Sequence, residues 1–180
     1  MIYIQDNFLD DSSFKLLDKE VRKMEFFNQD NDPHILQDAV YPGYRTDDWS
    51  KKYPLLDSYI IRLIERSGSP FTQQGRWEQN QYAYMRLSKD EEGEYRHTDP
   101  YDWAYLIYMS KTNLNSGTKF FETLDDKKEL EPLEGEIASA GFVQNRLVMF
   151  DCNIPHRSWG NHGTNFENGR LTINGFCLRR

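Results

Sequence analysis

His97 and Asp99 are separated by one residue, in the stretch RHTDP at positions 96–100. In an extended chain successive side chains point to opposite faces, so these two fall on the same side. An imidazole and a carboxylate side by side can occupy adjacent positions on a metal. They are two parts of the facial triad of two histidines and one carboxylate, which binds Fe(II) and leaves positions open. Alone, the triplet also fits a surface turn capped by Asp99.

Two later residues complete the pattern. His156 follows Pro155 after an apolar stretch, and Arg170 opens the last strand-like stretch. Two imidazoles and a carboxylate leave three positions on iron, of which a 2-oxo acid takes two and O2 the third. The far carboxylate of 2-oxoglutarate then needs a fixed bidentate cation, which Arg supplies better than Lys. We therefore predict metal ligands His97, Asp99 and His156, with Arg170 binding the cosubstrate.

Hydroxyl groups near Arg170 are further candidates for contacts with 2-oxoglutarate. Thr172 is two residues past Arg170 and therefore shares its strand face. Tyr82 and Tyr84 lie on one face of a strand together with Arg86. Both tyrosines fit core packing equally well, so the choice between them stays open.

The order of predicted elements favours a mainly β, α+β fold. Apolar residues at helical spacing predict helices from about residue 12 to 27 and over residues 51–66. Strand patterns follow, and we predict strands over residues 2–8, 77–87, 103–109, 118–123, 147–150 and 171–178. Helices followed by many short strands indicate a β-sandwich or barrel buttressed by helices. We expect one domain over residues 1–180, with a helical part (about 1–70) and a β core (about 71–180).

Several short motifs occur in the order seen in one enzyme family. Residues 4–9 (IQDNFL), 105–110 (YLIYMS), 116–120 (SGTKF) and 145–150 (NRLVMF), then His156, resemble motifs of the 2-oxoglutarate and Fe(II)-dependent dioxygenases. The nearest group is the prolyl-4-hydroxylase-like one. The resemblance implies a double-stranded β-helix (jelly-roll, cupin-like) with N-terminal helices packed outside. It also implies iron on His97, Asp99 and His156, 2-oxoglutarate on Arg170, and O2 as co-reactant.

Three features depart from the family pattern. The interval between His156 and the basic residue is longer than usual, and residues 161–168 account for the excess. Arg157 is the competing cation, although it adjoins a predicted ligand and points to the other face. Ser116 stands where the family's turn has a second glycine.

The remaining aromatic residues and histidines bear on the substrate. Tyr101, Trp103 and Trp159 are candidate substrate contacts. For Trp103 a role in the core is favoured over this one, and for Trp159 a place in a pocket wall and a place in the core fit equally well. The polar segment at residues 28–49 is a candidate lid, with Tyr41, Tyr44 and Trp49 as contacts. We interpret His34 and His162 as surface histidines, because they lie in polar segments. His34 is also a candidate for lining a substrate entrance.

Composition narrows the partners. With 22 Lys and Arg against 29 Asp and Glu, the net charge of −7 argues against a nucleic-acid substrate. No apolar stretch is long enough for a membrane span and no signal peptide is visible, so we expect a soluble, cytoplasmic protein. Cys152 and Cys177 are interpreted as buried thiols rather than a disulfide. The sequence leaves the oligomeric state open.

The predicted activity is hydroxylation of a C–H bond in a peptide or amino acid, with proline a candidate, and release of succinate and CO2. Two other classes stay open. A cupin-like metalloenzyme that does not use 2-oxoglutarate would not need Arg170. A non-enzymatic β-sandwich binding module would contact its small-molecule or peptide ligand through aromatic residues without iron.

Overall fold

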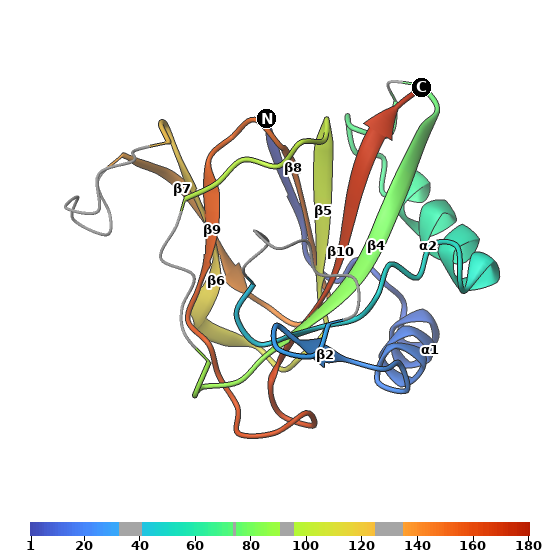
Figure 1. The fold of residues 1–180 in the computed structure, drawn as a ribbon. Coiled ribbons are helices and arrows are strands. Elements are labelled where there is room, and N and C mark those ends of the chain that lie inside the picture. The colour runs from blue at the N-terminus through green and yellow to red at the C-terminus, as the bar shows by residue number, and fades with distance from the viewer. Residues whose placement is uncertain (33–40, 74, 91–95, 125–134) are drawn as a thin grey trace.

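The computed structural model describes residues 1–32, 41–73, 75–90, 96–124 and 135–180 (Figure 1). Strands dominate these ranges, as predicted. The elements are β1 (Ile2–Gln5), α1 (Asp11–Val21), β2 (Phe27–Asn28), β3 (Tyr44–Arg45), α2 (Pro54–Arg66), β4 (Trp77–Arg86), β5 (Trp103–Tyr108), β6 (Asn113–Phe121), β7 (Glu136–Phe142), β8 (Arg146–Asp151), β9 (His156–Trp159) and β10 (Arg170–Arg179).

The strands form two antiparallel sheets that face each other (Figure 1). The major sheet has the order β1-β8-β5-β10-β4-β3-β2, and the minor sheet has the order β7-β6-β9. A core cluster joins the two, since Phe120 and Phe142 of the minor sheet pack with Tyr108, Val148 and Phe150 of the major sheet. The site described below lies between these sheets.

The two helices cover the opposite face of the major sheet (Figure 1). Asp10 caps α1 by accepting hydrogen bonds from the backbone N–H groups of Ser12 and Ser13, both at 2.9 Å. Pro54 opens α2, where its missing N–H costs nothing. The buried helix residues Leu17, Val21, Ile60 and Ile64 join one core cluster with residues of β4, β5, β8 and β10.

Alternation along β10 divides its side chains between the two faces. Leu171, Ile173 and Cys177 belong to the core cluster on the helix side. Arg170, Thr172, Asn174 and Phe176 line a cavity on the side of the minor sheet. Strand β10 therefore packs against the helices with one face and contributes side chains to the cavity with the other.

Several predicted boundaries need correction. Helix α1 ends at Val21 rather than near residue 27, and α2 starts at Pro54 rather than at residue 51. Strand β6 begins at Asn113 rather than at the predicted residue 118, and its pairing register shifts between Asn113 and Gly117. The bulge explains the error, because it breaks the regular alternation of the strand.

Four strands were missed. Strands β2 and β3 have two residues each and lie in a polar segment, while β7 and β9 are short and carry many small or polar side chains. Strands β1, β2 and β3 also join the major sheet, so the part predicted as helical, residues 1–70, contributes to the β core as well.

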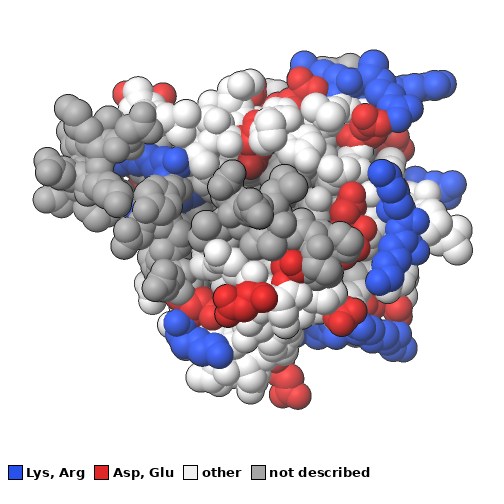
Figure 2. Space-filling model, viewed as in Figure 1, with Lys and Arg blue, Asp and Glu red and all other residues white. Residues whose placement is uncertain are grey.

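The described surface carries charges of both signs, and the cysteines are buried thiols as predicted. Figure 2 shows basic side chains interspersed with acidic ones on the described part of this face. Cys152 and Cys177 are buried free thiols. In the described ranges, no helix has the length and apolar character needed to cross a membrane.

Candidate active site

The backbone holds His97 and His156 side by side. The N–H of His97 donates to the carbonyl of His156 at 3.1 Å, and the N–H of His156 donates to the carbonyl of His97 at 2.9 Å. This antiparallel bridge brings the two rings to a centroid distance of 4.5 Å. The N–H of Asp99 donates to the carbonyl of Cys152 at 3.2 Å, which holds the rest of the triplet against the turn before β9.

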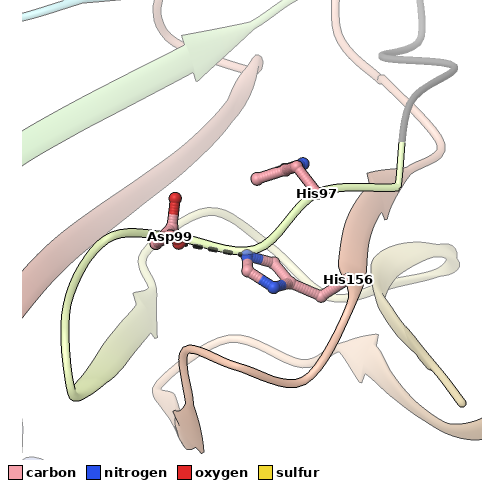
Figure 3. Close-up of side chains that lie close together, drawn as sticks. All are labelled: His97, Asp99 and His156. Atoms are coloured by element: carbon pink, nitrogen blue, oxygen red, sulfur yellow. Dashed lines mark ion pairs between the residues drawn. The ribbon is translucent and has the colours of Figure 1, made fainter. Parts of the chain in front are cut away.

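The three side chains converge on one point (Figure 3). Each offers one ligand atom, and these atoms lie within 4.8 Å of one another. His156 is 6% exposed, Asp99 is half-buried and His97 is exposed. The structure therefore brings together the three residues predicted as metal ligands, with one histidine reaching the site from the solvent side.

The contact between His156 and Asp99 tests whether these residues fit a metal ion. The Nδ1 of His156 lies 2.9 Å from the carbonyl oxygen of Ile154. A carbonyl can only accept, so Nδ1 carries a proton, and the neutral tautomer with that proton presents a lone pair at Nε2. This Nε2 faces Oδ2 of Asp99 at 3.2 Å, and that buried oxygen has no hydrogen-bond partner among the residues that the structure describes. In that tautomer two acceptors face each other, an arrangement that a shared metal cation would stabilise. A carbonyl partner on the other ring nitrogen is usual for ligand histidines.

The three residues line one wall of a cavity of about 1080 Å³ between the two sheets. Apolar side chains of Leu106, Phe150 and Phe176 line the same space. Arg170, Thr172 and Tyr84 line it too. The predicted metal ligands and the predicted cosubstrate residues therefore share one cavity.

Arg170 is 3% exposed and firmly held. Its Nε donates to Oγ of Ser116 at 3.1 Å, and its Nη2 donates to the carbonyl of Gly117 at 3.1 Å. Its guanidinium lies 5.2 Å from the ring centroid of Phe142. These contacts orient a buried cation toward the cavity, as bidentate binding of a carboxylate requires.

The departure from the family's turn motif has a structural role. Ser116 supplies the hydroxyl that accepts from Arg170, which a glycine could not do. Gly117 must stay small, because a Cβ there would lie 2.1 Å from the carbonyl oxygen of Ala140 on β7. Ser116 and Gly117 together shape the part of β6 that surrounds the Arg170 side chain.

The structure separates the two candidate tyrosines. Tyr84 lines the cavity, whereas Tyr82 packs between Tyr84 and Phe176 and does not line it. Burial raises the pKa of Tyr84, so its hydroxyl stays protonated and able to donate. Thr172 is 2% exposed and pairs in register with Tyr84, which puts both hydroxyls on the face of Arg170.

His162 was predicted to be an exposed surface histidine, and this is wrong. The side chain is half-buried, with its ring edge-on to Phe142 at a centroid distance of 5.3 Å. Both ring nitrogens are buried and have no hydrogen-bond partner in the described part of the chain. Burial and, secondly, the charge of Arg170 lower the pKa of His162, so the ring is held neutral beside Arg170. Only the fold of residues 160–169 brings it there.

None of the three predicted substrate contacts lines the cavity. Trp103 is fully buried in the helix-side core, with its ring centroid 5.0 Å from that of Trp77, which agrees with the favoured core role rather than with a substrate contact. Alternation on β5 turns it away from the minor sheet. Tyr101 accepts from Nδ2 of Asn80 at 3.1 Å and stacks behind the cavity residue Phe176. Trp159 lies under Nζ of Lys119 at 5.2 Å.

The polar segment at residues 28–49 contributes cavity lining that the sequence only partly indicates. Its described lining residues are Asn28, Gln29, Asp30, Tyr41, Pro42, Gly43 and Arg45. Arg45 lies over the ring of Tyr41 at 4.4 Å and donates to Asp32 at 2.6 Å. Tyr44 and Trp49 instead pack with the helix-side core. His34 lies outside the described residues.

No protein-family model matches the chain, and no curated protein matches it. Solved structures do match over 99% of this chain. The epimerase SnoN of nogalamycin biosynthesis, a non-haem α-ketoglutarate-dependent enzyme, is similar at 10% identity and a TM-score of 0.69, over 78% of its own chain.

Two further structures show the same fold. HygX from Streptomyces hygroscopicus, with nickel, 2-oxoglutarate and hygromycin B bound, is similar at 9% identity and a TM-score of 0.68, over 82% of its chain. A prolyl-4-hydroxylase from Pseudomonas putida is similar at 15% identity and a TM-score of 0.56, over 92% of its chain. The chain thus has the fold of the 2-oxoglutarate and Fe(II)-dependent oxygenases, as the ordered sequence motifs predict.

Proposed function

We propose that the protein is a 2-oxoglutarate and Fe(II)-dependent oxygenase, with its two sheets arranged as a double-stranded β-helix. The observation that carries the proposal is the contact of Nε2 of His156 with Oδ2 of Asp99 at 3.2 Å, beside His97. Two imidazoles and one carboxylate are the donor set of the facial triad that binds Fe(II) with open positions.

The cosubstrate assignment rests on the other residues of the same cavity. Arg170 would bind the far carboxylate of 2-oxoglutarate, and Thr172 and Tyr84 would donate hydroxyl hydrogen bonds to it. When bound, Fe(II) and 2-oxoglutarate supply the activation of O2 and the oxidation of a C–H bond, with release of succinate and CO2. Leu106, Phe150 and Phe176 exclude water from the reacting groups.

We propose that the substrate is a small molecule or peptide, with a peptide or amino acid, proline among them, as the first class to test. Likeness of the sequence motifs to the prolyl-4-hydroxylase-like group supports this choice, and so does the shared fold with the Pseudomonas putida prolyl-4-hydroxylase. The cavity of about 1080 Å³ has room for a substrate beside the cosubstrate. Succinate release in the presence of candidate peptides and free amino acids tests the class.

The deciding experiment is an anaerobic titration of Fe(II)-loaded protein with 2-oxoglutarate, followed by the visible metal-to-ligand charge-transfer band. We expect a saturable band in the wild type and none in Asp99→Asn or His156→Ala. Asp11→Asn, a carboxylate change on the exposed side of α1, is the matched control and should keep the band.

Two results would contradict the proposal. An iron-loaded wild-type protein without a band would exclude 2-oxoglutarate as cosubstrate. A band that persists in Asp99→Asn and His156→Ala would show that the metal lies elsewhere.

A further inference from the structure

A titratable ring and the buried arginine of the cavity contact the same phenylalanine. The ring of His162 meets Phe142 edge-on at a centroid distance of 5.3 Å, and the guanidinium of Arg170 lies 5.2 Å from the centroid of the same ring. Both nitrogens of His162 are buried and have no hydrogen-bond partner in the ranges that the structure describes. The neutral ring is therefore favoured, because a charged ring would be buried without partners for its two N–H groups.

The loop at residues 160–169 fixes the backbone on both sides of His162. Gly160 has a φ of +67°, and a Cβ there would lie 1.9 Å from the carbonyl oxygen of Asn115 on β6. On the other side, the carbonyl of Gly163 accepts from the backbone N–H of Ser88 at 2.8 Å. The same loop makes the interval between the last predicted metal ligand and the cosubstrate arginine longer than the family's usual spacing. The histidine therefore belongs to a segment in which this chain departs from the family pattern.

Charged and titratable groups of several elements surround the His162 ring and the Phe142 ring that it contacts. Among the described residues they include Arg170 on β10, Tyr108 on β5, Arg86 on β4, Lys89 and Asp90 in the loop after β4, and Arg146 on β8 with its ion-pair partner Asp6. The charge that acts on His162 is that of Arg170, which is, after burial, the second cause of the lowered pKa of His162.

A carboxylate bound at Arg170 would oppose this effect. Its negative charge offsets the positive charge that disfavours protonation of His162, so the ring takes up a proton more readily in the complex. The ligand acts through charge rather than burial, because His162 is not among the described residues that line the cavity. Linkage is reciprocal, so a ligand that promotes protonation of the ring binds more tightly when the ring is protonated.

We propose that His162 couples cosubstrate binding to proton uptake: 2-oxoglutarate bound at Arg170 favours the protonated ring, and its affinity therefore rises in mildly acidic solution. The inference rests on the proposed function, since it needs the carboxylate of the cosubstrate at Arg170. It assigns a role to a histidine that is neither a metal ligand nor a described residue of the cavity lining.

The test is a calorimetric titration of the Fe(II)-loaded protein without O2 at about pH 6, near the ordinary histidine value. Two buffers with different ionisation enthalpies are used, and the difference in heat gives the number of protons taken up per ligand bound. 2-Oxoglutarate is compared with 2-oxobutyrate, which chelates metal through the same atoms but lacks the carboxylate for Arg170. The comparison removes proton changes at the metal ligands, because both acids share them.

We expect the wild type to take up about half a proton more with 2-oxoglutarate than with 2-oxobutyrate. Relative to 2-oxobutyrate, the affinity for 2-oxoglutarate should be about threefold higher at about pH 6 than at about pH 7.5. A direct readout is the nuclear magnetic resonance titration of the His162 ring in the Zn(II)-substituted, diamagnetic protein. Its midpoint should move to higher pH when 2-oxoglutarate is added, but not with 2-oxobutyrate.

Two variants separate the charge of the ring from its packing. His162→Gln removes the titrating group, and His162→Phe also removes it but keeps an aromatic ring against Phe142. Both should lose the extra proton uptake and the pH dependence. At about pH 7.5, where the wild-type ring is neutral, their 2-oxoglutarate affinity should stay within about twofold of the wild type. Unchanged 2-oxobutyrate binding reports that each variant is folded and binds metal.

Three results would overturn the inference. Equal proton uptake with both acids in the wild type excludes the coupling. A difference that persists in both His162 variants assigns the proton to another group. An unmoved midpoint of the His162 titration on addition of 2-oxoglutarate excludes this ring as the site of uptake. In contrast, a wild-type protein that shows no charge-transfer band with either acid contradicts the proposed function itself, and the inference with it.

Discussion

The two faces of strand β10 carry different tasks. On the helix side, Leu171, Ile173 and Cys177 are fully buried among apolar residues. On the cavity side, Arg170 and Thr172 are almost as buried, at 3% and 2% exposure, but both line the cavity and Arg170 donates to polar groups of β6. Burial alone therefore does not distinguish a structural residue from a binding residue. The chemistry of the neighbouring atoms does.

This difference has a physical cause. Apolar burial on the helix side contributes stability without direction, in proportion to the area removed from water. Polar burial on the cavity side costs free energy unless each group finds a partner. The apolar packing on the helix side of β10 therefore holds the buried polar groups of its cavity side in position. The comparison predicts that mutations on the two faces affect different measurements.

The largest effect is expected for Arg170→Gln on the cavity side. Loss of the buried cation should weaken 2-oxoglutarate binding by about 100-fold or more, since it removes a bidentate charge-assisted contact. Binding of 2-oxobutyrate, which has no terminal carboxylate, should change little. Anaerobic titration of both acids measures this. Full 2-oxoglutarate affinity in the variant would assign the cosubstrate to another cation, with Arg157 the next to test.

On the helix side, Ile173→Ala should act on stability instead. The residue is fully buried, so its truncation should lower the free energy of unfolding by about 3 kcal/mol through lost burial and a cavity. Chemical denaturation measures the loss, and 2-oxoglutarate affinity in the remaining folded protein should stay unchanged. A shift in that affinity as large as the shift in stability would show that the two faces of β10 are coupled.

Ser116→Ala tests whether the polar partners of Arg170 on the cavity side orient this arginine for binding. The change removes the hydroxyl oxygen that accepts from Nε of Arg170. We expect about fivefold weaker 2-oxoglutarate binding, with 2-oxobutyrate binding as in the wild type. Ser116→Thr, which restores a hydroxyl, is the matched control. If Ser116→Ala lowered only thermal stability, Ser116 would support the fold without orienting Arg170.

The smallest effect concerns His162 and pH. Its lowered pKa means that the unfolded chain binds the proton more readily than the folded protein. The contribution of neutral His162 to stability is therefore full above about pH 6.5, the ordinary histidine value, and is lost as pH falls below it. His162→Gln should lose less stability than the wild type between pH 7.5 and about pH 5.5 in urea unfolding. Parallel curves would contradict the burial of this ring in solution.

Much of the architecture follows from local patterns in the chain. Alternation predicts that Tyr82, Tyr84 and Arg86 share one face of β4 and that Thr172 shares the face of Arg170, as the structure has it. The His-x-Asp triplet and the later His156 were also recognisable, because metal ligands are few in type and their order along the chain carries information. These features depend on residues close in sequence or on a short ordered list of motifs.

Only the tertiary structure decided the rest. Alternation tells which side chains share a face but not whether that face meets the helices or the cavity, so Trp103 stayed among the candidate substrate contacts although it packs in the helix-side core. Contacts such as Arg170 with Ser116, or Arg86 with Ser158, join strands from different sheets. Their pairing depends on strand register and on how the sheets face each other, which short-range spacing does not encode. The sequence by itself thus determined the chemical groups, and the packing of the two sheets determined which of them meet.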